Sequence, residues 1–198
     1  GLPSLGAFRM LDVDHPDRKA VGGSGGAWWW HSPQDTLDKA DVTVLAEDVE
    51  IYLVMTARMC TPDLIPYDFR PVARDFLQCL ELYQEVSGAH LDLRSVIEAA
   101  DAFGLAAERF ATLGAERNEA AKRISRIVNA ALFTIDGPYE MDPALQLPVL
   151  PALAPVAELG TLDPASDAYR FLRTRLVRQR NRVQDLLLTA TEHAEAVR

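Results

Sequence analysis

The stretch LDLRSVIEAADAFGLAAERF, from Leu91 to Phe110, decides the fold of this 198-residue chain. Its apolar residues recur every three or four positions, which is the spacing of one face of an α-helix. The positions on that face are Val96, Ala100, Phe103, Ala107 and Phe110. Asp92 is suited to cap the amino end of the helix, and Gly114 is suited to stop it. The pattern predicts a helix over about residues 93–113 with one buried face.

Segments on both sides of this stretch have the same periodicity. They predict helices over residues 71–86, 115–133 and about 167–196. The inward positions are Val72, Phe76, Cys79, Leu80, Tyr83 and Val86, then Ala121, Ile124, Val128 and Leu132, then Tyr169, Leu172, Leu176, Val183 and Leu187. Residues 137–155 are too proline-rich for regular structure. We therefore expect a mainly α protein, built as an antiparallel helical bundle.

The first sixty residues have a different character. A helix is predicted from Asp41, as its cap, to about Cys60, with Val44, Leu45, Val49, Tyr52 and Met55 on its inner face. Upstream, the apolar run 5–11 predicts one buried strand, and the glycine-rich residues 12–26 predict a loop. We expect two domains, 1–60 and 61–198.

Composition excludes several classes of protein. With 48% apolar and 25% charged residues, the chain has the make-up of a globular protein, and it lacks the run of roughly 18 apolar residues that a membrane span needs. A net charge of −9 argues against wholesale binding of nucleic acid. Six arginines between Arg170 and Arg182 therefore predict a solvated helix face with ion pairs. Cys60 and Cys79 form no CxxC pair, so neither a disulfide framework nor a thiolate zinc site is expected.

The start of the sequence gives two further expectations. Gly1 is not preceded by methionine, and no basic region with an apolar stretch follows it. We expect no signal peptide here, and a chain cut from something longer.

The segment WWWHSPQDTLDKAD, from Trp28 to Asp41, carries the candidate chemistry. Imidazole nitrogen is a preferred ligand of catalytic zinc, so His31 is a candidate metal ligand. Asp35, Thr36 and Asp38 offer oxygen acceptors for amides at a helix start, or for orienting the metal ligand from behind. The alternative is an ordinary histidine, at the surface or in the core, satisfied by hydrogen bonds.

The segment HSPQDTLDKAD resembles the last metal-ligand loop of zinc aminopeptidases of the M28 family. The preceding GLPSLGAFRM is similar to a strand of the same catalytic α/β domain. The resemblance implies that His31 binds one of two zinc ions and that Trp30 lines the substrate pocket. Packing against another domain is the equal alternative for Trp30.

The resemblance also implies a reaction: two zinc ions activate a bridging water, and a glutamate acts as general base in hydrolysis of amino-terminal peptide bonds. The other ligands and the glutamate belong to earlier segments of that family. The motif DVDHPD, with Asp12, Asp14 and His15, lies after the strand and is interpreted as a loop. We expect the chain alone to retain no zinc and to be inactive.

The helical part is similar to the transferrin-receptor-like dimerisation domain of the glutamate-carboxypeptidase-like branch of this family. Leu91–Phe110 and the proline-rich stretch PYEMDPALQLPVLP carry this similarity. It implies a homodimer, with peptide as the substrate of the parent enzyme, and it leaves the compartment open. The alternative function is a non-catalytic helical interaction module, resembling a receptor.

Overall fold

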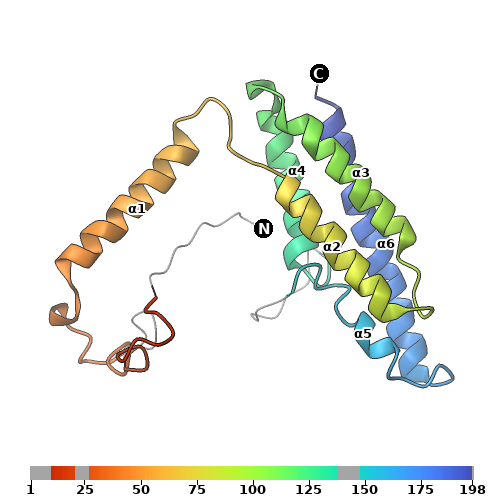
Figure 1. The fold of residues 1–198 in the computed structure, drawn as a ribbon, viewed down its shortest axis with the longest axis horizontal. Helices are drawn as coiled ribbons and strands as arrows, with labels where there is room; N and C mark the ends of the chain where they lie inside the picture. Colours follow the sequence, from red (N-terminus) through yellow and green to blue (C-terminus); the bar gives the residue numbers. More distant parts are fainter. Residues whose placement is uncertain (1–9, 21–26, 138–147, 198) are drawn as a thin grey trace. The chain divides into compact units, whose positions relative to one another are not determined.

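The computed structural model describes residues 10–20, 27–137 and 148–197. All regular elements among these residues are helices (Figure 1). The strand predicted over 5–11 lies outside the described residues except for Met10 and Leu11, which belong to no strand. The chain divides into two compact units, one extending to Pro62 and one beginning at Asp63. No helix in the described part is long and apolar enough to cross a membrane.

The N-terminal unit holds the 3-10 helix η1 (Leu37–Lys39) and the helix α1 (Val42–Cys60). Asp41 caps α1 as predicted, because its carboxylate accepts hydrogen bonds from the amides of Thr43 at 2.8 Å and Val44 at 3.2 Å. The predicted inner face of α1 was wrong, since no residue of this helix is buried. Apolar side chains occur around most of its circumference, so periodicity alone could not select one inner face.

The second unit is a helical bundle, as the sequence predicts. Its long helices are α2 (Arg70–Ser87), α3 (Arg94–Ala111), α4 (Asn118–Phe133) and α6 (Asp167–Glu195), with short helices η2 (Ala115–Arg117) and α5 (Val156–Leu159). In space, α3 packs between α2 and α6, and α6 packs between α3 and α4 (Figure 1). Neighbours α2 and α3 are antiparallel, as are α4 and α6.

The helices α3 and α6 pack side by side although they are not consecutive in the chain. Ser95 bonds to Gln184, and fourteen residues later on α3, Arg109 pairs with Glu195 on α6. Both residue numbers rise together, so these two helices run in parallel. An antiparallel up-and-down bundle gives its second and fourth long helices this common direction, because each of α3, α4 and α6 reverses the direction of the long helix before it.

The predicted stripes supply most of the core. Every inward position named for the stretch around α3 is buried. The largest fully buried side chains of the helices include Phe76, Leu80, Phe103, Phe110, Ile124, Leu176 and Leu187. Burying each such side chain stabilises the fold by about 1.5–3 kcal/mol. Val86 is the exception, since 46% of it is exposed in the last turn of α2.

Part of the proline-rich connection belongs to the core, which the sequence interpretation missed. Leu150, Leu153, Val156 and Leu159 are buried. Tyr83 and Cys79 of α2 both donate hydrogen bonds to the carbonyl oxygen of Val149, at 3.1 and 3.2 Å. The regular three-residue spacing of the four apolar side chains was the available signal.

Candidate functional site

The segment around His31 is a chain of tight turns. The amide of Trp30 donates to the carbonyl oxygen of Ala27, and the amide of Ser32 donates to that of Trp29, each at 3.0 Å. The Ser32 hydroxyl donates to the same Trp29 oxygen at 2.6 Å, and accepts the Gln34 amide at 3.2 Å. Ser32 therefore fixes the backbone on both sides of the histidine.

His31 has a backbone conformation that few residues adopt. Its φ is 59°, in the left-handed region, where a residue other than glycine is strained by about 1–3 kcal/mol. The imidazole is exposed and stacks on the Trp30 indole, with ring centroids 3.9 Å apart and 29° between the planes. Strain of this kind concentrates at functional sites, and here it presents an imidazole to solvent.

The polar residues after His31 bond mainly to one another. The Thr36 hydroxyl donates to Asp38 and to the Gln34 carbonyl oxygen, and the Lys39 ammonium donates to Asp38. Hydrogen bonds from Lys39 and then Thr36 hold the pKa of Asp38 below its usual range. In the described residues none of these groups, nor Asp35, bonds to the His31 ring, so their role behind a metal ligand stays a prediction.

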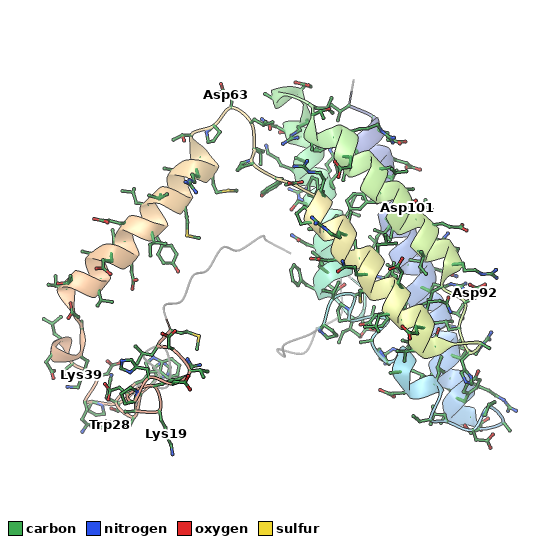
Figure 2. The ribbon with its side chains drawn as sticks, in the orientation of Figure 1. Lys19, Trp28, Lys39, Asp63, Asp92 and Asp101 are labelled. Atoms are coloured by element: carbon green, nitrogen blue, oxygen red, sulfur yellow. The ribbon has the colours of Figure 1, made fainter. Side chains whose placement is uncertain are left out.

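The three tryptophans point in different directions. Trp28 is 72% exposed and Trp30 is 57% exposed, whereas Trp29 is partly buried. Trp28 and Trp29 contact each other edge to face, with centroids 5.9 Å apart. Figure 2 labels Trp28 among the side chains of this segment. The large exposed surface of Trp30 leaves its assignment to a substrate pocket as a prediction.

The described residues bring no set of metal ligands together around His31. No group of three or more His, Cys, Asp or Glu gathers in that part of the chain. His15 of the DVDHPD motif is exposed, and its Nδ1 accepts the Asp17 amide at 3.2 Å. One imidazole does not hold a catalytic zinc ion, which needs three protein ligands. The described residues therefore do not form a complete zinc site.

Three arginines of α6 donate hydrogen bonds to backbone carbonyls of neighbouring segments. Arg173 donates to the His90 carbonyl oxygen at 3.1 Å, and Arg180 to that of Asp92 at 3.0 Å. Arg182 donates to the carbonyl oxygens of Ala130 and Ile135, each at 3.3 Å. Carbonyl groups at a helix end attract cations, so Arg182 stabilises the end of α4.

Ion pairs account for two further arginines of α6. Arg175 lies 3.6 Å from Asp136, and Arg170 lies 3.3 Å from Asp167 one turn away. The sequence predicts salt bridges to acidic residues of neighbouring helices, but one of these pairs lies within α6 and the other reaches the segment after α4. Half of these arginines bind backbone carbonyls instead, which helical periodicity does not reveal.

A groove between α2 and α3 is the other candidate site. It has a volume of about 540 Å³ and is open to solvent. Small residues form its floor, and arginines and carboxylates stand at its edges. Sequence interpretation missed it because Ala100 was assigned to a buried face and Ala73 and Gly104 to neither face of their helices.

The comparisons with known proteins add no relative. Neither protein-family models, nor curated proteins, nor solved structures give a match to the chain.

Proposed function

We propose that this chain is the C-terminal part of a co-catalytic zinc aminopeptidase. In this proposal His31 supplies one zinc ligand, the helical bundle supplies a homodimer contact, and peptides are hydrolysed at their amino ends. The order and spacing of HSPQDTLDKAD is the observation that carries it. The strained backbone and exposed ring of His31 support it, because a metal ligand needs an imidazole ring that is accessible to the ion.

The residues around His31 have roles that follow from their positions. Ser32 holds the turn, and Trp30 covers one side of the imidazole ring. No group of His, Cys, Asp and Glu that would supply the remaining ligands gathers among the described residues.

The 198-residue chain gives the first test. We expect no stoichiometric zinc by elemental analysis and no hydrolysis of aminoacyl-anilides. Tight binding of one zinc per chain, or measurable turnover, would show that this chain carries a complete site and would overturn its assignment as a part of one.

The parent protein gives the decisive test. We expect the gene to encode, before Gly1, an HxD motif, a Glu-Glu pair and a further Asp. In that protein, His31→Ala should remove zinc and lower turnover by more than about a hundredfold. His15→Ala is the matched control, because His15 is also exposed in the N-terminal unit. If the upstream motifs are absent, the alternative of a non-catalytic interaction module replaces the enzyme.

A further inference from the structure

The groove between α2 and α3 has a floor of small residues. Ala73 and Ala100 are buried, and a Cβ atom on Gly104 would lie 3.9 Å from the Cβ of Ala73 on the facing helix. The volume of the groove, about 540 Å³, is within the range of pockets that hold small molecules. Leu77 is partly buried on the α2 side and Leu105 is exposed on the α3 side, so both helices add apolar surface to it.

One end of the groove is spanned by an ion pair. Nη1 of Arg70, on α2, lies 3.8 Å from Oε2 of Glu108, on α3. The same guanidinium donates two hydrogen bonds of 2.9 Å to Asp68, so its charge is compensated. An occupant that ran along the whole groove, such as a helix of another protein, would have to displace this pair. The closed end therefore favours a short ligand.

Two further charges line the groove without a partner. Arg74 on α2 and Asp101 on α3 are exposed, and neither makes a hydrogen bond or an ion pair among the described residues. Figure 2 labels Asp101 on α3. Since α2 and α3 are antiparallel and Ala73 lies opposite Gly104, Arg74 and Asp101 are offset by about 3–5 Å along the groove. Opposite, unpaired charges therefore lie close together on the two edges of an apolar floor.

We propose that this groove binds a free α-amino acid with an apolar side chain. Arg74 binds the carboxylate of the ligand, and Asp101 binds its ammonium group. The ligand side chain lies on the floor formed by Ala73, Ala100 and Gly104. This site lies in the second unit and needs no zinc, so it is independent of the proposed function.

The chemistry of the two edges selects a zwitterion. A planar guanidinium binds a carboxylate through two parallel hydrogen bonds, and a carboxylate accepts hydrogen bonds from an ammonium group. Both charged groups of an α-amino acid are attached to one carbon, so a single small molecule bridges the offset between Arg74 and Asp101. A ligand with one charge satisfies only one edge. Because both edges are exposed, each ion pair contributes little, and we expect a Kd of about 1–10 mM.

Ligands that lack one charge test the assignment. An NMR titration of the isotope-labelled 198-residue chain, in about 0.15 M salt to screen its net charge, follows the amides of Ala73, Ala100 and Gly104. L-leucine should shift these signals saturably. Leucinamide, which lacks the carboxylate, and isocaproate, which lacks the ammonium group, should each bind at least about threefold more weakly. Free glycine should also bind more weakly than leucine, because it leaves the apolar floor uncovered.

Two variants assign each charge to one end of the ligand. Arg74→Gln should weaken leucine binding by about three- to fivefold, and should not weaken leucinamide, which has no carboxylate. Asp101→Asn should weaken leucine to a similar extent, and should not weaken isocaproate, which has no ammonium group. Arg178→Gln and Asp185→Asn make the same changes at exposed positions of α6 outside the groove, and should leave every affinity unchanged. Circular dichroism should show equal helix content in all four variants.

Each other outcome counts against this site. If no amide along the groove shifts at leucine concentrations up to about 50 mM, the groove binds no amino acid and is left to a larger partner, such as a helix of another protein. If leucinamide and isocaproate bind as tightly as leucine, the ligand is not recognised as a zwitterion. If Arg74→Gln weakens leucine and leucinamide equally, the loss comes from a change in the groove and not from a contact with the carboxylate.

Discussion

The guanidinium of Arg117 donates a 2.8 Å hydrogen bond from Nη1 to the carbonyl oxygen of Phe110. Its carbon Cζ lies 5.3 Å from the centre of the Phe110 ring, and only 6% of the residue is exposed. A second bond, from Nη2 to the Tyr67 carbonyl oxygen at 3.5 Å, is long, and Nε is buried without a partner. Arg117 thus places a buried cation at the carboxyl end of α3, where the helix dipole favours positive charge.

Replacing Arg117 tests how much this cation contributes. We expect Arg117→Met to lower the free energy of unfolding by about 1–3 kcal/mol, because the Phe110 carbonyl then loses a buried partner. Urea denaturation measures the change. Arg123→Met is the control at an exposed position of α4, and should change stability by less than about 0.5 kcal/mol. Equal stability of the two variants would contradict a role for the buried cation.

Asn118 holds the segment that enters the bundle. Its Nδ2 donates to the Asp63 carbonyl oxygen at 2.6 Å, and its Oδ1 accepts the Ile65 amide at 2.9 Å. We expect Asn118→Ala to release this segment and to raise the rate of proteolytic cleavage within residues 61–67, since cleavage follows local opening. Limited proteolysis with mass spectrometry locates the cut. Asn129→Ala, on the same helix, should leave the cleavage rate unchanged.

Gly104 tests whether the groove is open in the single chain. The added methyl group of Gly104→Ala meets nothing closer than the Ala73 Cβ at 3.9 Å, which is an ordinary contact. We expect a gain of about 0.5–1 kcal/mol in the free energy of unfolding, measured at concentrations where the chain is monomeric, because alanine loses less backbone entropy in a helix.

Gly114 provides the contrast. A Cβ there would lie 2.7 Å from Oε2 of Glu116, whose other carboxylate oxygen accepts the Gly114 amide. Gly114→Ala should therefore give no gain. For Gly104→Ala, a loss of stability in place of the expected gain would show that α2 and α3 pack too closely at Gly104 to admit a methyl group.

Asp92 makes the stability of the fold depend on pH. Its carboxylate accepts the Arg94 amide at 3.0 Å and also binds the Arg94 guanidinium, and these bonds, the guanidinium first, hold the pKa of Asp92 far below its usual range. A carboxyl with a lowered pKa in the folded state stabilises the fold above its unfolded pKa of about 4. This contribution is lost as the pH falls from there through the folded pKa.

The melting temperature should therefore fall less steeply between about pH 4 and pH 2 in Asp92→Asn than in the unmodified protein. Asp185→Asn, at an exposed position of α6, should keep the original slope. Parallel pH profiles for all three proteins would contradict the linkage.

The periodicity of apolar residues predicted those parts of the fold in which one helix face is buried and the other is exposed to solvent. The stripe from Val96 to Phe110 is right for this reason, because α3 packs against α2 on one side and α6 on the other. It could not select a face of α1, where apolar residues surround the helix. It also missed Leu150 and Leu153, because the neighbouring prolines suggested irregular structure.

The candidate site was also predicted only in part. His31 was identified from its neighbours in the sequence, and the structure adds its left-handed backbone, which no residue pattern shows. The groove between α2 and α3 was not predicted, because it depends on two helices meeting at Ala73 and Gly104, a tertiary contact between positions far apart in the chain.

The place of α6 has a consequence for how the protein is made. This last helix packs against α3 and α4, and it buries Leu176, Val183 and Leu187. A ribosome releases these side chains only after all the earlier helices have emerged. The hydrophobic faces of α3 and α4 are thus uncovered during synthesis until α6 has emerged from the ribosome. Completion of the core is a non-local step, so this bundle cannot close before α6 arrives, whatever has already formed among α2, α3 and α4.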